Sequence, residues 1–506
     1  MEIYLKLRAT NSKEIVYSPN KYRETEGIKD AFSINHTTPY ACISLQEMNM
    51  AYHYPIVYWN TACLSINGGA DDSLDDNKST DYGKIAIAIA NMQKDGVVIG
   101  LPTINEARFE FVPDAKNNRI IFALKGMNGI GDDVARIIVE NRPYSSIEDF
   151  CTRLVDTKLV KNSQMIKLIK GGCFTELHNT DRKVTMDWYL RNYVFEPCKS
   201  LTMQQFNKMK ELEFIPQSLE LPLRMINFKN YVLDDEGLYE KHIDEGKKIP
   251  KRGYHDGYYI LDNNSQSFFK EHFTEDSVVG IKGQYYIVSE KKFTKEVDAK
   301  IQPLKDWMSK EETLEAYNTR LFEELWNKHA EGSIPHWNME ALCYYDGEHE
   351  LEHVNEELYG IVNFFDLPED PEPYEWYTRY INGEPKSMPK YKISRIAGTV
   401  LNSDNTRHIT TVLTKYGVVN VKHNKGQYAF YNKTISESGE DGKKKRLEES
   451  WFKRGNLITC QGIRRGDQFV PMVYTDTIYK HTVNLINEVY EDGTLLMQTE
   501  RVQANQ

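Results

Sequence analysis

The sequence predicts an α+β chain of several domains, with a mainly helical N-terminal half and a small β-barrel near the C-terminus. Helical periodicity with glycine-rich turns before residue 178 indicates the first part, and five short β-branched runs between residues 391 and 478 indicate the second. The length of 506 residues corresponds to three or four domains at about 150 residues each.

Two helices are expected before residue 100. Apolar residues at positions 41, 45, 48 and 52 share one helical face, and Pro39 stands near its start, where proline is tolerated. Residues 66–81 are rich in Gly, Asp, Ser and Asn, which is typical of a loop. A second helix is expected over residues 82–96, ending at Gly96, and a short extended segment over residues 97–102.

A glycine-rich turn follows. Residues 126–131 read Gly-Met-Asn-Gly-Ile-Gly, between an apolar run and a helix that opens at Asp132. Glycine lets the backbone turn tightly, and the free N–H groups and dipole of a helix N-terminus favour an anion. The spacing is neither the dinucleotide fingerprint nor a Walker loop. The pattern alone leaves open an ordinary loop and a phosphate-binding turn, beside which Lys125 stands.

The middle of the chain carries fewer signals. Residues 179–335 are rich in Tyr, Lys and Glu, with short strands expected between residues 278 and 288 and a helix over residues 310–330. No role follows from these patterns.

The C-terminal region changes character. Its five β-branched runs predict an oligonucleotide-binding (OB) type of barrel, with a long loop between the third and fourth strands. They are residues 396–400, 409–413, 417–421, 457–460 and 469–473.

The charged and aromatic residues of this loop are both typical of a nucleic-acid-binding surface. The whole chain has a net charge of −11, which counts against a nucleic-acid binder, but residues 441–466 hold eight Lys or Arg against three Asp or Glu. Basic side chains follow phosphates, and aromatic rings stack bases. For Phe430 and Trp451, barrel core and base stacking stay open as alternatives. The aromatic residues near the loop are Tyr416, Tyr428, Phe430, Tyr431 and Trp451.

Two motifs suggest metal chemistry and are set aside. Residues 349–353 match the His-Glu-x-x-His zinc signature, but their surroundings are polar and no third ligand is identifiable. The carboxylate pairs at residues 71–72 and 75–76 lie in a loop, whereas two-metal catalysis needs carboxylates held firmly around both ions. We therefore expect no catalytic residue and no metal ligand on this chain.

Cysteine usage and hydropathy bound the location. The seven cysteines are scattered and form no Cys-x-x-Cys pair, which suits a reducing cytosol. No run of 18 apolar residues exists, and the N-terminus lacks a signal peptide's apolar core. We expect a cytoplasmic protein without a membrane partner.

The chain also resembles a known family over residues 28–178. Residues 31–64 resemble the end of the fingers domain of the bacterial DNA polymerase III alpha subunit, the C family of replicative polymerases, with matches that include Phe32, His36, Tyr40 and Pro55. The resemblance continues in order through residues 96–111, 122–154 and 168–177, and residues 339–353 are faintly similar to a further family segment.

The resemblance implies a role for each part. The glycine turn belongs to a tandem helix-hairpin-helix region that grips duplex DNA, the OB barrel lies towards single-stranded template, and the fingers residues lie near the incoming nucleotide. The implied nucleotide or template contacts are Asn35, His36 and Tyr40. The predicted DNA-binding residues of the glycine turn are Lys125, Gly126, Asn128, Gly129 and Gly131. Those predicted from the charge and aromatic pattern of the barrel loop are Tyr416, Lys443, Lys444, Lys445, Arg446, Lys453 and Arg454.

The departures from the family are equally informative. Only thirty residues precede Ala31, so we expect the palm with its catalytic aspartates to lie on another polypeptide, and Ile34 stands where the family has a lysine. We therefore expect the C-terminal portion of a split polymerase, of the kind that suits a bacteriophage, acting in a bacterial or phage-infected cytoplasm. Its partners would be primer–template duplex, single-stranded template and a palm-bearing half that holds Mg²⁺. A sliding clamp is a further candidate partner, with residues 266–269 as a weak candidate peptide.

The alternative is a stand-alone, non-catalytic DNA-binding accessory protein derived from a polymerase. In either case the expected organisation is the same. It comprises a fingers-like region (1–100), a tandem helix-hairpin-helix region (101–178), a mixed α/β region of unknown role (179–335), a linker region (336–390), the OB-like domain (391–480) and a C-terminal tail (481–506).

Overall fold

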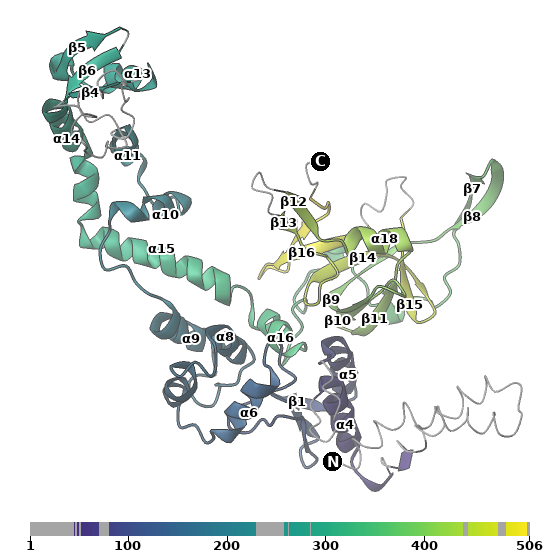
Figure 1. The fold of residues 1–506 in the computed structure, drawn as a ribbon. Coiled ribbons are helices and arrows are strands. Elements are labelled where there is room, and N and C mark those ends of the chain that lie inside the picture. Colours follow the sequence, from purple (N-terminus) through teal and green to yellow (C-terminus); the bar gives the residue numbers. More distant parts are fainter. Residues whose placement is uncertain are drawn as a thin grey trace, which may run out of the picture. The chain divides into compact units, whose positions relative to one another are not determined.

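The chain divides into two compact units (Figure 1). Residues 1–189 and 330–506 form the first unit, and residues 190–329 form the second. In this computed structural model, no helix of the described residues is long and apolar enough to cross a membrane. The described residues are 45, 48–49, 52–69, 80–228, 258–261, 263–283, 285–438, 444–473 and 482–502.

The first unit begins with two helices that pack on each other and on a small sheet. Helix α5 begins at Asp81, whose carboxylate accepts a hydrogen bond from the Lys84 backbone N–H (3.1 Å) and so caps the helix. The chain leaves α5 through Gly96 at a φ of +80°, so the predicted C-terminal glycine is confirmed. The elements are α4 (Ile56–Gly68), α5 (Tyr82–Lys94), β1 (Val98–Gly100), β2 (Val112–Asp114) and β3 (Arg119–Ile121), with sheet order β1-β3-β2.

Short helices separated by turns follow. Their apolar faces bury a common core in which the Phe150 ring packs against Tyr144 (4.9 Å between ring centroids) and Phe174 (5.1 Å). The predicted helix after the glycine turn is confirmed. The helices are α6 (Asp132–Glu140), α7 (Ile147–Phe150), α8 (Asn162–Lys170) and α9 (Arg182–Tyr189).

The second unit contains helices and one antiparallel sheet with the order β4-β6-β5. Phe273 stacks on both Phe269 and Phe293 in its core. The strands expected between residues 278 and 288 and the helix expected over residues 310–330 are confirmed. The elements are α10 (Phe206–Glu211), α11 (Glu220–Phe228), β4 (Tyr258–Ile260), α13 (Asn263–His272), β5 (Val278–Lys282), β6 (Tyr285–Ser289), α14 (Glu290–Met308) and α15 (Glu311–Ala330).

Residues 330–390 return the chain to the first unit. The region expected as a linker contains most of a helix that packs on α8, a single helical turn and a two-stranded antiparallel ribbon. These are α16 (Ile334–Leu342), α17 (Glu356–Tyr359), β7 (Glu375–Ile381) and β8 (Glu384–Lys390).

A closed five-stranded barrel follows. Strand β9 pairs antiparallel with β10 and β14, β10 pairs with β11, and β15 closes the barrel by pairing parallel to β11 and antiparallel to β14. A helix lies between the third and fourth strands. The elements are β9 (Ser394–Asp404), β10 (Ile409–Thr414), β11 (Gly417–Lys422), α18 (Lys425–Tyr431), β14 (Leu457–Arg465) and β15 (Gln468–Pro471).

The strand order and closure confirm the predicted OB-like barrel, and all five predicted strands are present. Gly398 and Gly462 lie where neighbouring strands approach closely, because a Cβ at either position would collide with a backbone carbonyl of the adjacent strand. Glycine at these two positions lets the small barrel close.

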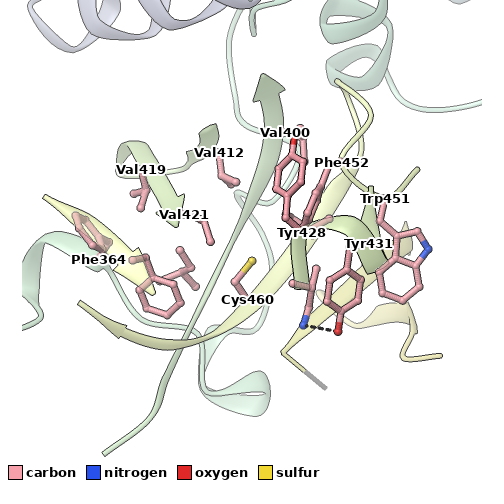
Figure 2. Close-up of a cluster of buried hydrophobic side chains, with 14 residues drawn as sticks. Phe364, Val400, Val412, Val419, Val421, Tyr428, Tyr431, Trp451, Phe452 and Cys460 are labelled. Atoms are coloured by element: carbon pink, nitrogen blue, oxygen red, sulfur yellow. Dashed lines mark hydrogen bonds between the residues drawn. The ribbon is translucent and has the colours of Figure 1, made fainter. Parts of the chain in front are cut away.

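The barrel core gathers four large aromatic side chains at one end, and valines with Phe364 and Phe469 at the other. Figure 2 shows Tyr428, Tyr431, Trp451 and Phe452 gathered beside α18, with Cys460 further along the barrel. Tyr431 and Trp451 stack with ring centroids 5.3 Å apart. Trp451 is completely buried, which decides between the two alternatives for this residue in favour of barrel core.

Two further hairpins extend the barrel. The first lies in the long loop after α18, formed by β12 (Ile435–Ser438) and β13 (Lys444–Glu448). The second lies in the expected C-terminal tail, formed by β16 (Val483–Val489), which pairs with β14, and β17 (Leu495–Gln498).

Candidate nucleic-acid interface

The glycine-rich turn is held from inside the protein. Gly126 is buried, and a Cβ there would lie 3.0 Å from the Phe111 and Phe122 rings. Asn128 donates its backbone N–H to the Ala341 carbonyl (2.8 Å) and its side-chain amide to the Glu340 carbonyl (3.0 Å). Gly126 and Asn128 therefore fix the position of the turn, and their polar groups point to the protein.

Lys125 is also engaged within the protein. Its ammonium pairs with the carboxylate of Asp132 in the first turn of α6, and its side chain is only 13% exposed. Asp133 follows Asp132 in the same turn. The α6 N-terminus thus carries two carboxylates, of which Lys125 neutralises one.

Gly129 and Gly131 are the exposed residues of this turn. Their backbone N–H groups have no hydrogen-bond partner in the described part of the chain. Gly129 has a φ of +87°, a conformation that favours glycine. Gly131 begins α6 in an extended conformation with open space where a Cβ would be. These two glycines form the anion-accessible part of the turn.

A second exposed turn leads into α8. Residues 156–159 and 161–163 are exposed, and the N–H groups of Asn162 and Ser163 have no partner among the described residues. Lys158 and Lys161 belong to this turn, and the first turn of α8 contains no acidic residue. Asp156 is the acidic residue of this turn, so the two lysines leave it with a net positive charge, and the α8 N-terminus favours an anion more than that of α6 does.

The sequence analysis missed this second turn because it contains no glycine. Lys158 takes a left-handed conformation (φ +62°), which L-residues with a Cβ rarely adopt. The available signal was the polar run Asp156-Thr157-Lys158 shortly before α8.

A buried ionic network fixes both turns to α16. Glu340 accepts from both Lys167 and Lys170 of α8. Burial raises the pKa of Glu340, but its two ammonium partners outweigh burial and leave it below the usual value. Burial lowers the pKa of Lys170 against the pull of Glu340. Because Glu340 also presents its carbonyl to Asn128, α16 holds the α6 and α8 turns in one framework.

Arg182 extends this network from α9. Its guanidinium donates to the Lys170 carbonyl (2.9 Å) and to the carboxylate of Asp346 (3.2 Å), and it also contacts Asn338. Burial raises the pKa of Asp346, which Arg182 opposes. The network is structural, and it fixes where the free N–H groups point.

Two cations of the barrel's basic loop share one carboxylate. Glu449 pairs with both Arg446 and Lys453; the hydrogen bond from Lys453 and the charges of both cations hold its pKa below the usual value. The Arg454 guanidinium lies 4.7 Å from the centroid of the Tyr82 ring. Lys445 lies opposite Glu437 on the β12–β13 hairpin and is exposed.

Three further cations of the basic loop are Lys443, Lys444 and Arg464. Lys443 lies outside the described residues, and Lys444 is described for its backbone, as the first residue of β13. Arg464 pairs with Glu369 (2.9 Å) and donates to the carbonyls of Phe365 and Leu367. Its role is to close the barrel end.

The aromatic residues near the loop separate by burial. Tyr428 and Tyr431 join Trp451 in the core, whereas Tyr416 and Phe430 are 36% and 37% exposed. The Tyr416 hydroxyl donates to Glu356 (2.8 Å), so one edge of this ring is fixed.

Glu448 is the anchor of this region. Its carboxylate accepts from Arg501 (2.8 Å), from the Trp451 indole (2.8 Å) and from the Gln498 amide (2.7 Å). Arg501 is buried and donates further to the Phe430, Tyr431 and Glu449 carbonyls. This cluster joins the segment after β17 to the loop after α18.

The His-Glu-x-x-His segment lacks the helical geometry of the zinc signature. Residues 349–353 form turns, not a helix. His349 is buried between the Leu413 carbonyl (3.0 Å) and the Leu351 N–H (3.0 Å), and burial lowers its pKa to about 4. His353 is exposed beside Glu348. Within the described ranges, no three His, Cys, Asp or Glu side chains are grouped to hold a metal ion.

Two other predicted sites are placed as follows. The fingers residues Asn35, His36 and Tyr40 lie outside the described residues. The candidate clamp peptide, residues 266–269, lies on α13, where Phe269 is 1% exposed in the core of the second unit. This phenylalanine is occupied by internal packing.

Comparisons with known proteins fit this geometry. A family model described as a helix-hairpin-helix motif matches residues 96–184, which include both turns. The chain is 42% identical over 481 residues to the probable DNA polymerase YorL of Bacillus subtilis strain 168, and equally to the DNA-directed DNA polymerase of Bacillus phage SPbeta. It is 24% identical over 222 residues to a DNA polymerase III subunit alpha from Buchnera aphidicola. The chain is therefore homologous to part of proteins named DNA polymerases.

The aligned region is a much larger fraction of this chain than of its relatives. The Bacillus subtilis and phage matches span 94% of this chain and 35% of each relative, and the Buchnera aphidicola match spans 43% and 17%. The chain thus spans about a third of the length of the first two relatives.

Proposed function

We propose that this chain is the DNA-binding portion of a C-family replicative DNA polymerase, and that it holds primer–template DNA for a palm supplied by another polypeptide. The observation that carries the proposal is the pair of exposed turns at α6 and α8, each with free N–H groups at a helix N-terminus. Homology to proteins named DNA polymerases supports the same function.

Duplex binding is assigned to the two turns together. Backbone N–H groups and helix N-termini contact phosphate without reading sequence, as a replicative enzyme requires. Lys158 and Lys161 add two charges at α8, whereas α6 offers the open approach at Gly131. The OB-like barrel would hold the single-stranded template, since barrels of this class bind single strands.

A protein partner is supported by an exposed apolar face near the N-terminus. Leu45, Met48 and Tyr52 share one side of a helix by their spacing and are 65%, 67% and 85% exposed. Exposed large apolar residues gathered on one face are typical of an interaction surface. We assign this face to the palm-bearing polypeptide, which would hold Mg²⁺ through its own carboxylates, in the bacterial or phage-infected cytoplasm.

Replacing Gly131 tests the α6 contact. Gly131→Asp places a favourable capping residue at the start of α6, so the folded state keeps or gains stability. Its carboxylate would repel a phosphate, and we expect duplex affinity to fall at least about ten-fold, the equivalent of about 1.4 kcal/mol. Gly131→Asn, which has the same size without the charge, should cause a smaller loss. Unchanged affinity in both variants would exclude phosphate binding at α6.

The two lysines of the α8 turn provide a matched comparison with Lys125. The double change Lys158→Gln, Lys161→Gln should reduce the salt dependence of duplex binding by about 0.9 for each phosphate that these lysines neutralise in the wild type. Lys125→Gln should change it little, because Asp132 already occupies that ammonium. Fluorescence anisotropy at several salt concentrations measures both slopes. Equal effects at the two sites would contradict the assignment.

Primer extension tests whether this chain binds DNA while another polypeptide carries the catalytic residues. We expect no extension by this chain alone and extension when the palm-bearing polypeptide is added. Extension by the chain alone would place catalysis on it. Purification from the native cell without any polymerase polypeptide would favour the stand-alone accessory protein.

A further inference from the structure

The β7–β8 ribbon is a surface with no role so far. Trp376 and Tyr380 are 61% and 72% exposed, and every described side chain of β7 is exposed. The ribbon ends four residues before β9, the first strand of the barrel (Figure 1).

The pairing register gives the ribbon two different faces. Side chains alternate along each strand, and residues opposite each other share a face. One face is uncharged and consists of Trp376, Thr378 and Tyr380 on β7 with Pro385, Ser387 and Pro389 on β8. The other face carries the charges.

The charged face holds a facing pair of cations, with Glu384 two residues from one of them. Glu375 pairs with Lys390 (2.9 Å) near the base of the ribbon. Arg379 and Lys386 lie directly opposite each other, and neither has an ion-pair partner within 4.0 Å among the described residues. Like charges at facing positions destabilise a hairpin. Their juxtaposition costs stability unless an anion binds between them.

We propose that the β7–β8 ribbon binds single-stranded DNA along its edge, with bases stacked on the face of Trp376 and Tyr380 and phosphates reached around the edge by the long side chains of Arg379 and Lys386 on the opposite face. The inference rests on the DNA-binding function proposed above and adds a site to it. The facing cations Arg379 and Lys386 outnumber Glu384, the carboxylate next to them on this face, and the resulting positive charge favours a polyanion. Trp376 and Tyr380 lie four residues apart on one strand, about 13 Å at 3.3 Å per residue, so each ring takes its own base. Single-strand binders combine such rings with a positive surface.

Aromatic truncation gives the first test. In the full chain, the double change Trp376→Ala, Tyr380→Ala should lower affinity for fluorescein-labelled oligothymidylate at least about ten-fold, since one stacked base is worth about 1–3 kcal/mol. Affinity for a DNA duplex should stay within two-fold, roughly the 0.5 kcal/mol scatter of a neutral surface change. Tyr490→Ala, which removes a ring that is 42% exposed on the β16–β17 hairpin, serves as the matched control.

A charge change separates binding from folding. Arg379→Glu creates a favourable facing pair with Lys386 and should stabilise the ribbon, yet it should lower oligothymidylate affinity and reduce its salt dependence. Arg320→Glu makes the same change in net charge on α15, outside the first unit, and should leave binding unchanged.

The outcomes distinguish this site from the function on which it rests. Loss of single-strand affinity in both ribbon variants, with duplex affinity retained, supports the proposal. Unchanged single-strand affinity in the ribbon variants overturns the ribbon site and leaves the duplex-binding proposal intact. The same conclusion follows if the ribbon variants lose assembly with a protein partner and keep their affinity for DNA. A wild-type chain that binds neither single-stranded nor duplex DNA overturns both proposals.

Discussion

The helix-hairpin-helix region and the barrel offer an anion different groups. At α6 and α8 the free groups are backbone N–H donors, and the side chains around them are used to fix the turns. In the barrel loop the candidate groups are cationic side chains, and Glu449 already pairs with two of them. A local excess of Lys and Arg therefore does not measure free positive charge. What matters is which cations lack a carboxylate in the folded chain, as at Lys158, Lys161, Arg379 and Lys386.

The largest expected effect follows from breaking the anchor of the barrel. Glu448→Ala would leave the buried guanidinium of Arg501 without its carboxylate, and we expect the free energy of unfolding to fall by about 3–5 kcal/mol. Chemical denaturation followed by fluorescence measures this loss. Glu449→Ala, one residue further along, breaks more exposed ion pairs and should cost at most about 1 kcal/mol. Equal losses would show that Glu448 and Glu449 act alike and that the buried cluster is not the anchor.

This contrast shows what the sequence could and could not predict. The five barrel strands were predictable because β-branched runs between polar loops are a local signal, and Gly96 and Gly131 mark helix ends for local reasons. The partners of charged residues were not predictable, because Glu369 lies 95 residues before Arg464 and Glu340 lies 170 residues after Lys170. Such pairs form through tertiary contacts that composition does not contain. The turn before α8 was missed because Lys158 takes a conformation that sequence patterns assign to glycine.

Acid should weaken the barrel through two buried histidines. Burial lowers the pKa of His423 to about 3 and that of His349 to about 4, from the ordinary 6.5. Between each folded value and 6.5 the unfolded chain binds more protons, so stability is full above pH 6.5 and is lost as pH falls through this window. Neither ring nitrogen of His423 has a hydrogen-bond partner among the described residues.

Replacing His423 measures this effect. From pH 8 to pH 5 each buried histidine should cost about 2 kcal/mol, so His423→Leu should remove about that much of the loss. Denaturation midpoints at both pH values give the comparison, and His353→Leu, at an exposed position, is the control. An acid loss equal in the wild type and in His423→Leu would show that His423 titrates normally.

The smallest expected effect is on single-strand binding by the barrel loop, and it tests whether pairing with Glu449 keeps the loop cations from DNA. Glu449→Gln removes the carboxylate that neutralises Arg446 and Lys453, and both cations are exposed enough to reach DNA. If the barrel loop faces the single strand, affinity for oligothymidylate should rise and its salt slope should steepen by up to about 0.7 for each released cation that binds phosphate. Duplex affinity should not change, because the α6 and α8 turns lie outside the barrel. An unchanged slope would mean that these cations serve only the barrel, and single-strand binding would then depend on other groups, first among them the β7–β8 ribbon.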